Sequence, residues 1–122
     1  MMKKLLPALL LCLPLVTVAA SEEDMHRSIC QKLIQGGTFF VNYERTCQLS
    51  SRVTDKIAQN MAGLQCLQTF GMPQADAWSK EEQGNFIRVF NSYNDKNAFC
   101  SDNRQDYINT EKMMDEIGKN IR

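Results

Sequence analysis

The chain has a single histidine among its 122 residues and no excess of charge, because 14 basic side chains balance 14 acidic ones. This balance removes the strong electrostatic case for nucleic-acid binding, which is typical of proteins with a basic patch or stripe, so we expect no nucleic-acid partner. The sequence also has no glycine-rich phosphate loop and no Gly-x-Ser-x-Gly motif. These absences favour a protein that is not an enzyme and that needs no cofactor.

Metal ligands are equally scarce. His26 lies four residues before Cys30, so the two side chains would share one helix face. A structural metal site usually adds a close pair such as Cys-x-x-Cys, whereas the cysteines after Cys30 follow at gaps of 17, 19 and 34 residues. Neighbouring carboxylates such as Glu81 and Glu82 point about 100° apart on a helix and do not converge. We therefore expect neither a metal site nor a catalytic residue.

The first residues have the pattern of a secretory signal peptide. Lys3 and Lys4 precede an apolar run from Leu5 to Val16, and Val18-Ala19-Ala20 supplies small residues before Ser21. The run is shorter than the roughly 20 residues of a membrane-spanning helix, and prolines interrupt it. The sequence predicts a signal peptide at 1–20, cleavage near Ala20–Ser21, and a periplasmic or secreted bacterial protein with no membrane span in its mature form.

Cleavage there would remove Cys12 and leave Cys30, Cys47, Cys66 and Cys100. An even number of cysteines in a small exported domain indicates disulfides, and four cysteines form two. Cleavage would also remove two lysines, which lowers the formal net charge from 0 to −2. We therefore expect a single, slightly acidic, disulfide-linked domain at 21–122.

Apolar residues repeat at helical spacing through most of this domain. We expect helices at about 21–35, 53–70, 79–93 and 103–121, with Gly36-Gly37 ending the first one and Ser79 capping the third. The segment 38–49 is a short helix or a short strand, and we prefer the helix. The predicted fold is all-α: a small up-and-down bundle of four to five helices with two disulfides.

The antiparallel layout discriminates among the three pairings that four cysteines allow. If successive helices alternate in direction, Cys30 and Cys66 lie at one end of the bundle, and Cys47 and Cys100 lie at the other. Disulfide formation needs Cα atoms within about 7 Å. We therefore predict the bridges Cys30–Cys66 and Cys47–Cys100, each contributing about 4 kcal/mol in the chain-entropy model.

The loop between the predicted helices 53–70 and 79–93 is the first candidate for contact with a partner. It runs from Met72 to Trp78, and an exposed tryptophan is a favoured interface anchor. The polar turn that contains Asp95 and Lys96 is the second candidate. These features favour a protein that binds another protein, as an inhibitor, an immunity-type protein or a secretion accessory, and the partner and oligomeric state remain undetermined.

Two alternatives stay open. The first is a helical carrier with an apolar cavity among the helices, lined by Phe40, Met61, Phe86, Phe90 and Met114. The second is an acid-stress chaperone of the periplasm, because protonation of 14 carboxylates would make the chain strongly positive and strain the fold.

N-terminal sequencing of the protein recovered from the periplasm or the medium tests the proposed leader. Because the small residues at Val18 and Ala20 match the signal-peptidase pattern, we expect the mature chain to begin at Ser21. An exported chain that retains Lys3 and Lys4 would contradict this prediction.

Overall fold

The computed structural model describes residues 14–121, all of whose regular elements are α-helices. It confirms the predicted all-α bundle with two disulfides. The described helices are α2 (Pro14–Thr46), α3 (Arg52–Gly63), α4 (Cys66–Phe70), α5 (Met72–Asn91), α6 (Lys96–Asp102) and α7 (Arg104–Ile121). The greater part of the predicted signal peptide, residues 1–13, lies outside the described residues.

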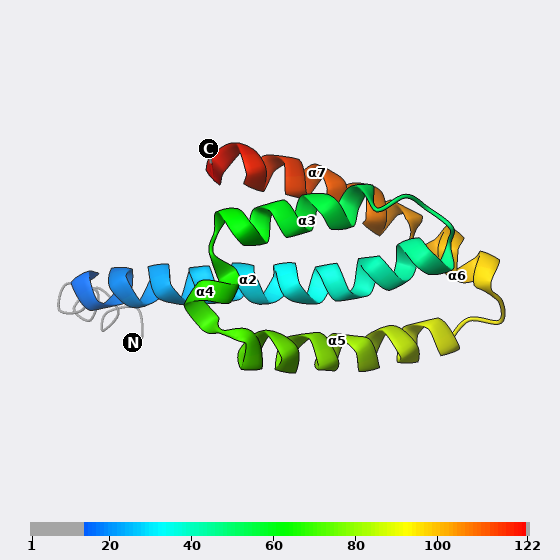
Figure 1. Cartoon of the computed structure of the whole chain (residues 1–122), viewed down its shortest axis with the longest axis horizontal. Helices are drawn as coiled ribbons and strands as arrows, with labels where there is room; N and C mark the ends of the chain where they lie inside the picture. The colour runs from blue at the N-terminus through cyan, green and yellow to red at the C-terminus, as the bar shows by residue number, and fades with distance from the viewer. Residues whose placement is uncertain (1–13, 122) are drawn as a thin grey trace, which may run out of the picture.

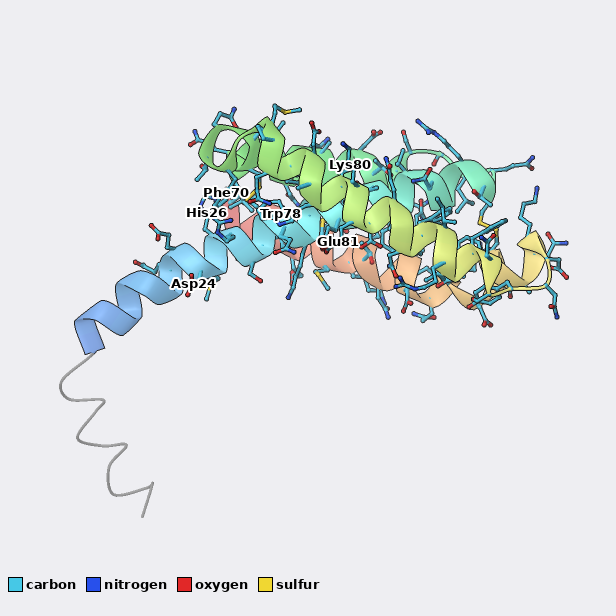
Figure 2. The ribbon with its side chains drawn as sticks, turned by 90° about the horizontal axis from the view of Figure 1, so that it is seen from below. Asp24, His26, Phe70, Trp78, Lys80 and Glu81 are labelled. Atoms are coloured by element: carbon cyan, nitrogen blue, oxygen red, sulfur yellow. A yellow bond between two sulfur atoms is a disulfide. The ribbon has the colours of Figure 1, made fainter. Side chains whose placement is uncertain are left out.

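The four long helices run up and down along a common direction (Figure 1). Helix α2 packs against α3 on one side and α5 on the other, and α7 packs against α3. Figure 1 shows α2 and α5 running from left to right, while α3 and α7 run back. The N-terminal part of α2 extends beyond the other helices in both whole-chain views (Figures 1 and 2).

The prediction that Gly36-Gly37 ends the first helix was wrong. Helix α2 continues through both glycines to Thr46, so the segment 38–49 is mostly the C-terminal part of the same helix. Each glycine costs about 0.5–1 kcal/mol of helix stability relative to alanine. Helices α2 and α3 lie close together here, because a Cβ atom at Gly37 would be in van der Waals contact with Ile57 on α3, at 3.4 Å.

The predicted helix 53–70 is interrupted, and the loop expected after it is helical. Gln65 has a left-handed backbone with φ of 55°, which separates α3 from α4. Gly71, with φ of 85°, ends α4 as predicted, but α5 begins at once. Pro73 falls in the first turn of α5, where its missing N–H is not needed. Ser79 therefore lies inside α5 and shares a hydrogen bond with Thr38 instead of capping a helix.

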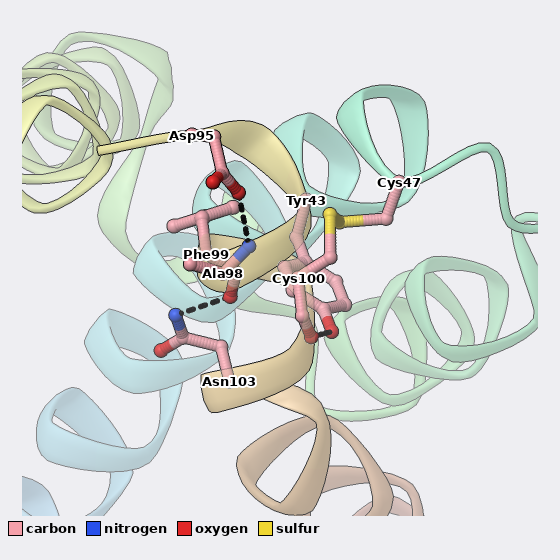
Figure 3. Close-up of a disulfide and its surroundings, with 7 residues drawn as sticks. All are labelled: Tyr43, Cys47, Asp95, Ala98, Phe99, Cys100 and Asn103. Carbon is pink, nitrogen blue, oxygen red and sulfur yellow. Dashed lines mark hydrogen bonds between the residues drawn. A yellow bond between two sulfur atoms is a disulfide. The ribbon is translucent and has the colours of Figure 1, made fainter. Parts of the chain in front are cut away.

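Both predicted disulfides are confirmed. The Cα atoms of Cys30 and Cys66 are 5.4 Å apart, and those of Cys47 and Cys100 are 5.8 Å apart. The second bridge ties the C-terminal end of α2 to α6, where the Tyr43 hydroxyl also donates a 2.6 Å hydrogen bond to the Cys100 carbonyl (Figure 3). The bridges therefore hold α2 at two separate points along its length.

A cluster of aromatic rings fills the end of the bundle beside α6. Phe99 is fully buried at its centre. The rings whose centroids lie within 6.4 Å of the Phe99 ring belong to Phe39, Tyr43, Phe86, Phe90 and Tyr93. Because these rings come from α2, from α5 and from the turn after α5, the short helix α6 joins the two long helices through Phe99.

The buried carboxylate of Glu44 joins three helices. It accepts hydrogen bonds from the Val53 N–H at 3.1 Å, the Thr54 N–H at 3.3 Å and the Thr54 hydroxyl, all in the first turn of α3. It also accepts one at 2.7 Å from the Tyr107 hydroxyl on α7. A carboxylate suits this place, because the first N–H groups of a helix have no partner within the helix and form the positive end of its dipole.

Burial, followed by the hydrogen bond to Glu44, raises the pKa of the Tyr107 hydroxyl above its ordinary value. The hydroxyl therefore stays protonated and remains a donor throughout the neutral range. On the surface, Glu111 of α7 pairs with Arg52 and Lys56 of α3 at 2.8 and 3.0 Å. Ion pairs that solvent still reaches contribute little stability, typically about 1 kcal/mol or less, so the Glu44 contacts and apolar packing are the stronger contributions that hold α7 in place.

The Glu44→Gln variant tests the role of this carboxylate. Its amide keeps the shape but loses the charge and directs an NH₂ group at the donors of α3 and Tyr107. We expect a loss of about 2–3 kcal/mol in the free energy of unfolding, measured in urea with the disulfides intact. Tyr107→Phe removes one hydrogen bond and should cost about 1 kcal/mol. A Glu44→Gln variant as stable as the parent would contradict the account.

Candidate functional site

An apolar groove of about 380 Å³ lies between α2 and α7 and is the strongest candidate site in the described part of the chain. One face of α2 forms one wall, with Ile29, Leu33, Gly36 and Phe40 spaced at four, three and four residues. Ile57 of α3 lies between the two walls. The α7 wall consists of Thr110, Met113, Met114 and Ile117. We call this space the α2–α7 groove.

The groove has one closed end. Phe40, the last residue of the α2 wall, packs against the ring of Tyr107 on α7, with ring centroids 5.8 Å apart, and this contact joins the two walls at that end. At the other end the groove continues past Ile29 and Ile117 into a shallower hollow beside Gly63 and Ile121. The site is therefore a slot with one blocked end, open along its length to solvent.

Two residues give the groove its room and its polarity. Gly36 contributes no side chain at the centre of the α2 wall, and a Cβ atom built there would still lie 4.0 Å from Ile57. Lys32 is the one charged residue along the walls. Met113 lies at the solvent edge, where its side chain is 57% exposed. Methionine side chains adapt to ligands of irregular shape because they are unbranched and polarizable.

Two of the five residues expected to line an apolar cavity, Phe40 and Met114, line the α2–α7 groove. Phe86 and Phe90 instead pack on Phe99 in the aromatic cluster, and Met61 lines a different hollow between α2 and α3. The sequence places these residues on apolar faces but does not indicate which neighbouring helix each face meets.

The structure corrects the prediction that Trp78 is an exposed interface anchor. Trp78 lies within α5, not in a loop, and only 7% of its surface is exposed. Its ring packs against Phe70 of α4 at 5.9 Å, and the Arg27 guanidinium lies 5.0 Å from the Phe70 ring. Figure 2 shows Trp78, Phe70 and His26 gathered where α2 and α5 meet.

The other predicted contact residues are exposed but do not form one surface. Met72 begins α5 and is 56% exposed. Asp95 and Lys96 lie beyond the opposite end of α5 (Figure 1). Asp95 has a structural role, because its carboxylate accepts a 2.8 Å hydrogen bond from the Ala98 N–H and caps α6 (Figure 3).

His26 also has a structural environment. Its Nε2 atom lies 2.9 Å from the Leu64 carbonyl at the end of α3, and its ring packs on Phe70 at 5.1 Å. Cys30, which follows His26 by four residues on α2, is bonded to Cys66. Within residues 14–121, no group of three or more His, Cys, Asp or Glu side chains is arranged to hold a metal ion.

Sequence reasoning missed the groove and the Glu44 contacts, although both left a signal. Glu44 follows Phe40 by four residues and so continues the apolar face of α2 with a charge. Gly36 interrupts the same face with a missing side chain. A charged residue on a buried helix face indicates a hydrogen-bonding or ionic partner within the protein. A glycine on the same face indicates space beside the helix.

No protein-family model matches this sequence, and neither the curated proteins nor the solved structures contain a match. In the described part of the chain, none of the helices combines the length and the apolar character needed to span a membrane.

The fluorescence of Trp78, the one tryptophan of the chain, tests the burial of this residue. Because its ring packs between α2, α4 and α5, we expect blue-shifted emission and weak quenching by iodide in the native protein. Unfolding with the disulfides reduced should shift the emission to the red. If the native protein emits at the same wavelength as free tryptophan, Trp78 is exposed, as the sequence predicted, and the buried position is wrong.

Proposed function

We propose that this protein is an exported, non-enzymatic binding protein that holds a small apolar ligand in the α2–α7 groove. The observation that carries this proposal is the groove itself, with its nearly continuous apolar walls, its closed end and its single charged residue. Sites for small ligands are typically concave, largely preformed and apolar, with a few polar groups and volumes of about 300–1,000 Å³. At about 380 Å³ the groove lies within that range.

Several contacts support a preformed groove. Its closed end depends on Tyr107, whose hydroxyl is fixed by the buried Glu44 carboxylate. Cys30 directly follows the wall residue Ile29, and the Cys30–Cys66 bridge attaches that part of α2 to α4. A site that is rigid before binding loses less conformational entropy when the ligand enters.

Export is the second part of the proposal. The two disulfides favour an oxidising compartment, and the residues 1–20 have the composition of a signal peptide. Cleavage after Ala20 would leave the groove complete, because its first wall residue is Ile29.

Binding of another protein is the competing proposal. The burial of Trp78 removes the anchor on which the predicted contact loop depended. An amphipathic helix of a partner could still insert apolar side chains into the groove, as happens in helix-in-groove recognition. The test below therefore separates a small ligand from a protein partner.

A pair of glycine variants tests the groove directly. Gly36→Leu places a side chain in the middle of the groove, whereas Gly84→Leu adds the same side chain to α5, where a Cβ atom has no neighbour within 4 Å. Both replace a glycine inside a helix, so both should gain helix stability. Only Gly36→Leu should lose binding of an apolar fluorescent probe such as N-phenyl-1-naphthylamine, by roughly tenfold or more for a blocked site.

Native mass spectrometry of the protein purified from the periplasm completes the test. We expect a small apolar molecule on the parent and on Gly84→Leu, and none on Gly36→Leu. Equal probe binding by all three proteins would contradict the proposed site. If the parent binds a protein partner and both leucine variants still bind it, the binding surface lies outside the groove and the proposed site is wrong.

A further inference from the structure

Lys32 is the one positive charge along an otherwise apolar groove. The described ion pairs involve Arg52, Lys56 and Lys119 with Glu111, Asp115 and Glu116, and none includes Lys32. Without residues 1–20 the chain has a formal net charge of −2, so the protein as a whole does not attract anions. The positive charge of Lys32 is therefore a local feature of the groove. An ammonium group beside an apolar slot matches a ligand with an anionic head and an apolar tail.

The volume of the groove indicates one short chain. A dry apolar cavity of about 150 Å³ accommodates one benzene molecule, with six carbon atoms. By the same measure, the groove of about 380 Å³ has room for roughly fifteen carbon atoms. One acyl chain of ten to fourteen carbons would fit this space, and the two chains of a phospholipid would exceed it.

The position of Lys32 gives the ligand a direction. Lys32 precedes Phe40 by eight residues on α2, which is about 12 Å along the helix axis. Between them the groove passes Gly36, where no side chain obstructs it, and ends at the contact between Phe40 and Tyr107. A chain whose head lies at Lys32 would therefore extend past Gly36 toward the closed end.

We propose, on the basis of the function proposed above, that the ligand is a medium-chain fatty acid. Its carboxylate pairs with the Lys32 ammonium at the mouth, and its alkyl tail lies against Leu33, Ile57 and Met114. The alkyl tail supplies most of the affinity, at about 0.8 kcal/mol for each buried CH₂ group. The Lys32 pair selects the charge of the head group, because a cationic head would meet a like charge at the same place.

Displacement of N-phenyl-1-naphthylamine by three amphiphiles with twelve-carbon chains tests the proposal. The competitors are dodecanoate, dodecyltrimethylammonium and dodecylphosphocholine, each below its micelle concentration. The proteins are the parent, Lys32→Met, and Lys80→Met as the matched control, since Lys80 is an exposed lysine of α5 away from the groove walls (Figure 2).

We expect the parent and Lys80→Met to bind dodecanoate most tightly of the three. Lys32→Met should weaken dodecanoate binding by roughly twofold to fivefold, the range of an exposed ion pair, and should leave dodecyltrimethylammonium binding unchanged or stronger. Raising the salt concentration should weaken dodecanoate binding to the parent more than to Lys32→Met.

The contrary outcomes are distinguishable. If all three amphiphiles bind the parent equally and Lys32→Met changes none of them, the fatty-acid inference is wrong while the apolar groove stands. If dodecylphosphocholine binds best, the head group is a phosphate ester and not a carboxylate, which also overturns the inference. If neither the probe nor any amphiphile binds the parent, the proposed function itself fails.

Discussion

The arrangement of the helices depends on the hydrogen bonds that the buried Glu44 carboxylate accepts from two neighbouring helices. It accepts hydrogen bonds from the first turn of α3 and from Tyr107 of α7, so a single residue of α2 sets the positions of two other helices. Tyr107 in turn meets Phe40 and closes the end of the α2–α7 groove. The polar core of the bundle and the apolar site are thus parts of one arrangement, because the group that orients α7 also shapes the slot beside it.

The sequence predicts the helical class and the disulfide pairing well, for reasons that survive an error in the layout. The predicted reversal at Gly36-Gly37 does not occur, yet both layouts place Cys30 and Cys47 at different ends of the bundle. In the structure Cys30 lies within α2 and Cys47 directly follows it, and their separation of 17 positions corresponds to about 25 Å along the helix. Cys66 lies at the end of the next helix, level with Cys30. The pairing depends on the position of each cysteine along the long axis of the bundle. That position follows from the helix lengths, which the hydrophobic periodicity of the sequence indicates.

The site could not be predicted in the same way, because it depends on which faces meet. Phe86 and Phe40 are equally apolar in sequence, but one packs on Phe99 and the other lines the groove. Trp78 lies five residues after Pro73 and directly before Ser79, a pattern that predicts a loop ending at a helix cap. The structure places all three residues inside α5, since a proline is tolerated in the first turn of a helix. The helix begins at Met72, seven residues before the predicted cap, and Trp78 is therefore a buried ring of α5 and not an exposed anchor in a loop.

If the space between α2 and α7 is a ligand site, a bound ligand contacts its walls, and methyl NMR spectroscopy during a dodecanoate titration locates that contact. We expect saturable shifts in the methyl signals of Ile57, Met113, Met114 and Ile117, which line the groove. We expect no change at Met72 and Ile87, which are exposed on α5. Shifts at Met72 and Ile87 with unchanged groove methyl signals would show that the ligand binds elsewhere.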